Sequence, residues 1–356
     1  MTQMLKILKL ANATKQPLPN AWGINSLQPL PLLHEATLEY LRHTKNLLAF
    51  SGGGDSTALF FLLHENKIPF DIVHVNYQIR AQSNEEEAYA RTLANTHTKE
   101  LFTLTCKLDA SNFEHHAREE RYSFFVKVIQ EHNYETLLTA HHLGDQLEWF
   151  LMQLCKGAGL VEMLGMQEIE ERENYTIVRP LLHISKKRLQ TYLNEHSILY
   201  FNDESNDSLH YKRNQFRHHY AHPMIDDYET AIAKSFAYLQ EDKKRLLPPI
   251  MERINDLFII PKQSDELLNI RQIDKALKLL GILPSKAQRD EILPTHSCVI
   301  GGKIAVCYTD EKIFIAPYCK IEMDKKFKEV CRKERIPSKI RPYLFQEGID
   351  PSALSR

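Results

Sequence analysis

Residues 47–59 read Leu47-Leu48-Ala49-Phe50-Ser51-Gly52-Gly53-Gly54-Asp55-Ser56-Thr57-Ala58-Leu59, and this stretch decides the fold. An apolar run ends at three glycines, and Asp-Ser-Thr then begins a second apolar run with helical spacing. The pattern predicts a strand, a tight loop and a helix, because glycine adopts positive φ and lets the backbone approach a ligand. The first turn of such a helix presents unpaired N–H groups and a positive dipole end, which favour a phosphate chain.

Two common phosphate-binding motifs do not fit this loop. The P-loop requires Gly-Lys-Ser/Thr, and the dinucleotide fingerprint requires a third glycine that is missing here. A plain turn between a strand and a helix, capped by Asp55 or Ser56, also explains the segment. The pattern Ser-Gly-Gly-x-Asp-Ser resembles the PP-loop of ATP pyrophosphatases, which split ATP between the α- and β-phosphates. That resemblance implies ATP binding by Ser51, Gly52, Gly53, Gly54, Asp55 and Ser56.

The composition is that of a soluble globular protein. The chain has 356 residues, 43% hydrophobic and 26% charged, which suggests two or three domains. Its formal net charge is −1, so a nucleic-acid partner must be met by local positive patches. Six cysteines without a Cys-x-x-Cys pair suit a reducing compartment. No apolar run reaches transmembrane length and the start lacks the organisation of a signal peptide, so we expect a cytoplasmic protein with no membrane partner. The sequence leaves the oligomeric state open.

The segments after the loop alternate between strand and helix. Strand-like segments follow at 71–76, 101–105 and 136–140, and helix-like segments at about 84–98, 112–131 and 144–155. Nearly continuous apolar strands separated by helices predict an α/β fold, a parallel sheet with helices on both faces. Ligands bind at the carboxyl ends of the strands in such folds.

We expect three parts along the chain. Prolines punctuate residues 1–44, which predicts a loose N-terminal arm. Residues 45–225 are expected to form the catalytic domain, a Rossmann-like PP-loop ATPase. Residues 226–356 begin with charged, leucine-bearing helical segments, continue into a β-hairpin around Asp310-Glu311 and end in a basic tail. The tail over 325–341 forms a local positive surface that suits nucleic acid, although a solvated helix face explains it as well.

Two further motifs supply polar and basic side chains. His74-Val75-Asn76 ends the second strand, with Arg80 close behind, and on its own it reads as a strand tail that meets solvent. Arg118 and Arg121 lie three residues apart on one helix face, where they equally suit pairing with neighbouring glutamates.

The stretch 139–148 runs from a strand end into a helix. Asp145 and Glu148 are one helical turn apart, so both carboxylates can enter one site, where they can hold Mg²⁺ or receive an amine. His141 and His142 are adjacent at a strand end and point to opposite faces, which argues against a shared zinc ion. We expect one of these histidines to be packed and the other to be functional.

A turn-rich segment and a basic segment follow one another later in the chain. Residues 202–207 have the composition of a turn. Residues 211–219 are basic and aromatic, as a contact with a phosphate backbone requires, or as the solvated start of a helix.

Taken in order, these motifs resemble tRNA(Ile)-lysidine synthetases. The resemblance covers residues 46 to about 220 and includes Arg179-Pro180-Leu181-Leu182. It implies a two-step reaction on the wobble cytidine of a tRNA(Ile) with a CAU anticodon. ATP adenylates the C2 oxygen of cytosine with release of pyrophosphate, and the ε-amine of free lysine then displaces AMP to form lysidine.

The resemblance also implies roles for individual residues. The catalytic residues would be Asp55, Arg118, Arg121, Asp145 and Glu148. ATP would be held by the loop together with His74 and Asn76, and Mg²⁺ by Asp55 and Asp145. The tRNA and lysine would contact Arg80, His141, His142, Asp203, Asn206, Arg213, Asn214 and Arg217.

Three positions depart from the family pattern. Gly144 stands where the family usually has an aspartate, Trp149 where it has a threonine, and Tyr77 where histidine is common. These departures bear on metal or lysine binding, while the retained Asp145 and Glu148 keep the core of the motif. Two alternatives remain, a tRNA thiolase of the same superfamily and a non-catalytic nucleotide sensor. The lack of paired cysteines speaks against the first, and the retained carboxylate pair against the second.

Overall fold

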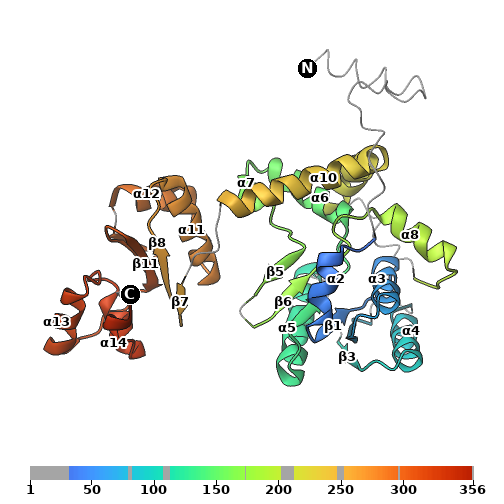
Figure 1. Cartoon of the computed structure of the whole chain (residues 1–356), viewed down its shortest axis with the longest axis horizontal. Helices are drawn as coiled ribbons and strands as arrows, with labels where there is room; N and C mark the ends of the chain where they lie inside the picture. The colour runs from blue at the N-terminus through green and yellow to red at the C-terminus, as the bar shows by residue number, and fades with distance from the viewer. Residues whose placement is uncertain are drawn as a thin grey trace, which may run out of the picture. The chain divides into compact units, whose positions relative to one another are not determined.

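The computed structural model describes residues 32–78, 82–106, 113–172, 174–201, 212–246, 252–295 and 297–354. The chain divides into two compact units, residues 1–240 and residues 241–356, labelled along the chain in Figure 1. Among the described helices, none combines the length and the apolar composition that spanning a bilayer requires.

A six-stranded sheet forms the centre of the first unit, in the order β3-β2-β1-β4-β6-β5. The strands are β1 (Asn46–Ala49), β2 (Phe70–Asn76), β3 (Leu101–Thr105), β4 (Thr136–Leu138), β5 (Ile169–Glu171) and β6 (Thr176–Val178). All neighbours pair in parallel except β5, which runs antiparallel to β6 at the edge. The predicted α/β fold with a mostly parallel sheet is confirmed.

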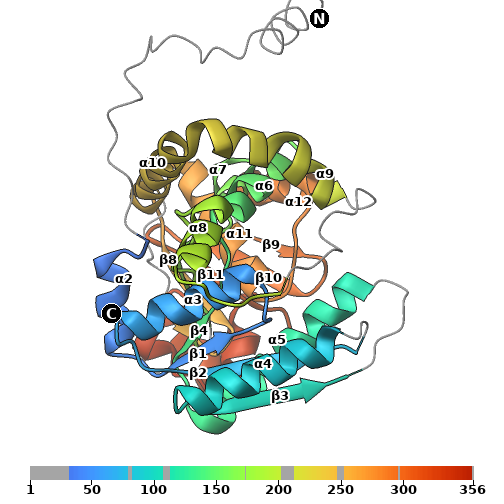
Figure 2. The same cartoon turned by 90° about the vertical axis from the view of Figure 1, so that its right-hand side faces the viewer.

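Helices cover both faces of this sheet because successive strand residues point to opposite sides. Leu48 joins a buried cluster with α2, α3, α4 and α8, whereas Leu47 joins a second cluster with α5. Helix α3 packs against α8, and the two lie side by side in Figures 1 and 2. The helices of this unit are α2 (Glu35–Arg42), α3 (Gly54–Glu65), α4 (Gln82–Thr96), α5 (Phe113–His132), α6 (Leu143–Leu154), α7 (Leu160–Met163), α8 (Lys186–Glu195), α9 (Lys212–Phe216), a π-helical turn (Arg217–Ala221) and α10 (His222–Leu246), whose last turn belongs to the second unit.

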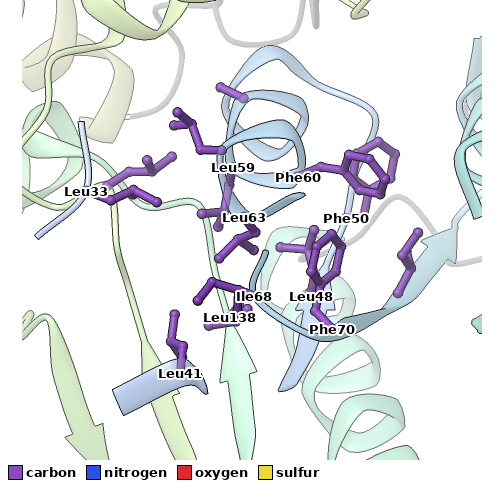
Figure 3. Packing of buried hydrophobic residues seen from close by; sticks show 14 of the residues in the cluster. Leu33, Leu41, Leu48, Phe50, Leu59, Phe60, Leu63, Ile68, Phe70 and Leu138 are labelled. Atoms are coloured by element: carbon purple, nitrogen blue, oxygen red, sulfur yellow. The ribbon is translucent and has the colours of Figure 1, made fainter. Parts of the chain in front are cut away.

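Helix α2 contradicts part of the expectation of a loose arm over residues 1–44. Leu38 and Leu41 are buried, and Leu41 lies near Leu138 in the core (Figure 3). Their spacing of three residues gives α2 one apolar face, which outweighs the prolines that precede it. Residues 1–31, the rest of the expected arm, lie outside the described residues.

The second unit contains a five-stranded antiparallel sheet in the order β7-β8-β11-β10-β9. Its elements are β7 (Glu252–Ile254), β8 (Leu257–Pro261), α11 (Glu266–Leu279), α12 (Lys286–Thr295), β9 (Ser297–Ile300), β10 (Ile304–Tyr308), β11 (Lys312–Pro317), α13 (Lys325–Lys333), α14 (Arg341–Glu347) and a 3-10 turn (Pro351–Leu354). Strands β10 and β11 pair around Asp310 and Glu311, which confirms the expected hairpin. One face of the sheet packs on α11 and α12 and the other on α13 and α14.

Candidate active site

The glycine-rich loop connects β1 to α3 at the carboxyl end of the sheet. Gly52 has a φ of +84°, a conformation that favours glycine. Gly53 precedes α3 and no side chain caps this helix, so N–H groups of its first turn are left for a ligand. Ser56 Oγ donates to Gly53 O at 3.0 Å and lies 3.1 Å from Ser51 Oγ. These contacts fix the shape of the loop while Asp55 stays accessible.

A segment distant in sequence supports one side of the loop. The Phe201 N–H donates to Gly52 O at 3.0 Å, and Phe201 forms a β-bridge with Gly53. The ring of Tyr200 lies so close that a Cβ added at Gly54 would be 3.1 Å from it. The third glycine of the loop therefore lets this ring pack closely against the backbone, where a methyl group would press on it.

A cavity of about 560 Å³ lies over the loop. Its cationic lining comes from Arg118 and Arg121 on α5 and from Lys186 at the start of α8. The rest of the lining includes Ser51, Gly53, Gly54, Asp55, Ser56, Tyr122, Thr139, His141, Gln190, Tyr200 and Phe201. A backbone loop, a helix N-terminus and three cations around one cavity suit a polyphosphate.

His142 lies between the loop and helix α6. Its Nδ1 accepts a hydrogen bond from the Gly144 N–H at 3.0 Å, which places the ring proton on Nε2. Nε2 is 3.8 Å from Asp55 Oδ2 and 3.6 Å from Asp145 Oδ2. The buried imidazole therefore lies between the carboxylate of the loop and the carboxylate at the start of α6.

His141 is directed to the cavity instead. Its Nδ1 lies 2.9 Å from Thr139 Oγ1, and burial lowers the pKa of the imidazole to about 4. His141 is thus neutral at physiological pH. The two neighbouring histidines point in opposite directions at the strand end, so His142 lies near the carboxylates and His141 lines the cavity. Neither belongs to a group of potential metal ligands among the described residues.

Asp145 and Glu148 form a compact cluster with two arginines. Arg217 Nε donates to Glu148 Oε2 at 2.9 Å, and Arg213 Nε donates to Glu148 Oε1. Both arginines also donate through Nη2 to Asp145 Oδ1, each at 3.3 Å. Glu148 is almost fully buried, with a side-chain exposure of 2%, whereas Arg213 is 47% exposed. The carboxylate pair is therefore held by the chain's own guanidinium groups.

The electrostatics of this cluster favour ionised carboxylates. Burial acts to raise the pKa of Asp145, but His142, His141, Arg213 and Arg217 together outweigh it and lower the pKa below its usual range. The Asp145 carboxylate also accepts the His142 backbone N–H at 3.0 Å. The Asp145 carboxylate is therefore ionised at physiological pH.

Other predicted site residues lie away from the cavity or outside the described residues. His74 and Asn76 are buried and do not line the cavity. His74 Nδ1 donates to Phe50 O at 2.9 Å, and Asn76 Nδ2 donates to Glu87 Oε2 at 2.9 Å. Asn214 is buried in α9, next to the arginine cluster. Arg80, Asp203 and Asn206 lie outside the described residues.

The structure adds residues that the motifs did not single out. Lys186 and Gln190 of α8 line the cavity, with Tyr200 and Phe201 beyond the end of that helix. Ser185 caps α8 by accepting the Arg188 N–H at 3.3 Å. Serine is a common helix cap, so the sequence could have located the start of α8, although not its position beside the cavity.

The unusual Gly144 and Trp149 have local structural reasons. A Cβ at Gly144 would lie 2.6 Å from Cε1 of His142, so glycine lets that ring fold over the start of α6. Trp149 Nε1 donates to Glu162 O at 2.9 Å, and the indole packs near Gly165. Trp149 thus fastens α7 to α6.

Comparison with known proteins finds a matching domain family and several similar enzymes. The family model described as a PP-loop domain matches residues 31–223. A tRNA(Ile)-lysidine synthase from Wolinella succinogenes is 47% identical over 315 residues, which cover 88% of this chain and 96% of the relative. The enzymes of the same name from Campylobacter jejuni and Helicobacter pylori are 45% and 43% identical, over 91% and 87% of this chain and 99% and 92% of theirs. The chain therefore belongs to the tRNA(Ile)-lysidine synthase family of ligases.

Proposed function

We propose that this ligase joins free L-lysine to C2 of the wobble cytidine of a tRNA(Ile) with a CAU anticodon. In the first step, the C2 oxygen attacks the α-phosphorus of ATP and pyrophosphate leaves. In the second, the ε-amine adds to C2 and AMP leaves with the former C2 oxygen, while the amine loses a proton. The observation that carries the proposal is His142, which joins the Asp55 side of the site to the Asp145 side within a few ångströms.

The cavity over the loop fits ATP. The first-turn N–H groups of α3 face the triphosphate position, and Arg118, Arg121 and Lys186 supply positive charge around it. These groups orient the α-phosphate and stabilise the charge that develops on the departing pyrophosphate, tasks of positioning and electrostatics. Asp55 lines this cavity with a side-chain exposure of 33%, so its carboxylate is available for Mg²⁺.

Asp145 fits Mg²⁺ less well than Asp55 in this conformation. Its Oδ1 accepts from Arg213 and Arg217, and its Oδ2 accepts from the His142 N–H. We therefore assign Mg²⁺, which would neutralise phosphate charge, first to Asp55. Asp145 becomes a ligand only if both arginines release it.

The Asp145–Glu148 pair is the proposed site for the lysine amine. The guanidinium groups of Arg213 and Arg217 form ion pairs with these carboxylates. The site therefore already stabilises positive charge. Lysine binding then exchanges one organic cation for another, with the arginines moving toward the tRNA phosphates. His141, neutral and on the cavity side, is suited to contact the cytosine.

We assign ATP and lysine chemistry to residues 45–225 and contacts with the tRNA backbone to residues 226–356. In the second unit, Lys325 and Lys326 are exposed at the start of α13, and Asp324 caps that helix by accepting the Phe327 N–H. Phosphate contacts need such concentrated positive charge because the chain as a whole carries a formal charge of −1. The cytoplasm, where thiols stay reduced, suits this reaction and the six free cysteines.

The decisive experiment follows label from lysine into tRNA. The full chain is incubated with ATP, Mg²⁺, labelled lysine and a tRNA(Ile) transcript with a CAU anticodon, and the nucleosides are separated after digestion. We expect lysidine, together with equimolar AMP and pyrophosphate. The control transcript carries uridine at the wobble position and should incorporate no lysine. Incorporation of sulfur from a thiol donor instead would favour a thiolase, and binding of ATP without any transfer would favour a sensor.

A further inference from the structure

A second group of ligand-type side chains lies apart from the cavity. His34 directly precedes α2, Glu168 directly precedes β5, and His183 lies between β6 and α8. One candidate ligand atom from each residue lies within 4.8 Å of the others. The three come from segments far apart in the sequence, and none of them lines the cavity over the PP-loop.

One pair of atoms in this group already has the spacing of two ligands of a metal ion. His34 Nδ1 is 3.3 Å from Glu168 Oε2. Two ligand atoms of a tetrahedral zinc ion are about 3.4 Å apart, given zinc–ligand distances of about 2.1 Å. The rings of His34 and His183 are stacked, with centroids 3.5 Å apart and an interplanar angle of 11°. Because the two ring planes are nearly parallel, one imidazole must turn before a nitrogen of each ring can point at the same ion.

The group also has an outer partner of the kind that metal ligands have. The buried Thr37 Oγ1 donates to Glu168 Oε1 and thereby fixes the orientation of the carboxylate. His34 Nδ1 lies 3.4 Å from Oε1 and 3.3 Å from Oε2, the oxygen to which Thr37 does not donate. Two imidazoles and one carboxylate form a donor set that binds zinc and leaves a fourth position for water.

We propose that His34, Glu168 and His183 bind a divalent transition-metal ion, zinc in the first instance. The ion would hold α2 against the rest of the first unit, through the segments before β5 and α8. Without the metal, α2 is attached by its apolar face and by the contacts of His34 and Thr37 with Glu168. The site also touches the catalytic region through the backbone, because Ile184 O, next to His183, accepts the Leu143 N–H at 2.9 Å at the start of α6. Zinc at this site therefore supports the segment from which Asp145 and Glu148 project.

The test is zinc binding by the full chain after removal of metals with a chelator. Equilibrium dialysis against buffered zinc, followed by elemental analysis, should give one more zinc per chain for the wild type than for His34→Gln, Glu168→Gln or His183→Gln. Replacing an outer partner of a metal site weakens binding about 10–100-fold, so we expect this loss for Thr37→Val and at least as much for the ligand variants.

The matched control is His43→Gln on the same helix. His43 Nε2 also lies close to a carboxylate, 3.1 Å from Glu39 Oε1, but it belongs to no group of three ligands among the described residues. This variant should bind zinc as the wild type does. Equal zinc content in wild type and His34→Gln would overturn the proposal and leave a hydrogen-bonded histidine–glutamate pair.

Two further measurements separate metal loss from misfolding and from binding by cysteine. Zinc should raise the Tm of the wild type and of His43→Gln, but not of Glu168→Gln, while all three chelated proteins show the same circular dichroism. Cobalt at the site should give d–d absorption without a thiolate charge-transfer band. A thiolate band that persists in His34→Gln would assign the metal to cysteine and contradict the site.

Discussion

The two halves of the candidate site differ in how much of their chemistry is already satisfied. The PP-loop half is open: its helix start is uncapped, and Asp55 faces a cavity of about 560 Å³. The carboxylate half is closed, because Arg213 and Arg217 hold Asp145 and Glu148. On the assignment proposed above, ATP enters a ready site, whereas lysine competes with groups of the enzyme itself. This difference agrees with the order of the two chemical steps.

The largest effect should come from breaking the open half. Asp55→Ala removes the carboxylate assigned to Mg²⁺, and we expect pyrophosphate release to fall by a factor of about 10³ or more. The side chain is one third exposed, so the Tm should change little. Pyrophosphate release in a single turnover measures the effect, and Asp55→Asn separates loss of charge from loss of size. An Asp55→Ala protein that adenylates tRNA at the parental rate would remove Asp55 from the site.

Glu148→Gln tests the closed half. The change keeps the shape but removes the charge that attracts an amine, so the KM for lysine should rise roughly tenfold, a loss of about 1.4 kcal/mol. The KM for ATP should stay within about twofold, because the PP-loop half is untouched. Steady-state kinetics with each substrate varied in turn give both values, with the exposed Glu195→Gln as control. Equal losses for lysine and ATP would assign the carboxylates to Mg²⁺ alone.

Gly144→Ala probes the histidine that joins the halves. The new methyl group would collide with His142, whose ring must swing away from Asp55 and Asp145. Loss of the His142 cap of α6 should lower the free energy of unfolding by about 1 kcal/mol. The higher helix propensity of alanine should raise it by about the same amount, about 1 kcal/mol. We expect little change in Tm and a severalfold loss of lysidine formation. The control is Gly159→Ala, where the methyl group would make only an ordinary van der Waals contact, and this variant should stay active. An equal loss of lysidine formation in the control would contradict a role for His142 between Asp55 and Asp145.

The smallest effect is expected far along the chain and should leave both halves unchanged. Replacing Lys325, Lys326 and Lys328 by alanine should weaken tRNA binding and flatten its salt dependence, by up to about 0.9 in slope for each phosphate that is no longer neutralised. The KM values for ATP and lysine should be unaltered. Filter binding at several salt concentrations tests this prediction. Unchanged tRNA affinity at low salt would show that α13 is a solvated helix face and does not contact the tRNA.

The sequence predicted the open half better than the closed one, for a physical reason. Residues 51–56 are contiguous, so the requirements of the loop appear as a local pattern of glycines and hydroxyls. The parallel sheet was likewise visible, because each buried strand is a short apolar run. The pairing of Glu148 with Arg217 was not, since it joins residues 69 positions apart. Basic residues before α10 suggested phosphate contacts, and nothing local revealed that carboxylates hold them here.

For helix α2, a local sequence pattern gave the wrong prediction. Its prolines upstream favoured a loose arm, but two leucines of α2 bury themselves in the core. Lys186 was missed for a similar reason: its importance comes from the position of α8 above the loop rather than from its own sequence context. Burial and proximity depend on which elements pack together, and a single sequence does not show this directly.

The position of His142 has a consequence for how the two substrates affect each other. The Nε2 atom of His142 carries one proton and lies 3.8 Å from the Asp55 carboxylate and 3.6 Å from the Asp145 carboxylate. If the imidazole moves closer to one carboxylate, its interaction with the other becomes weaker. On the proposed assignment, a cation and ATP that engage Asp55 leave the Nε2 proton to Asp145, and the affinity of Asp145 and Glu148 for a second cation then changes. Thermodynamic linkage makes this relation reciprocal: whatever factor ATP imposes on lysine binding, lysine imposes on ATP binding.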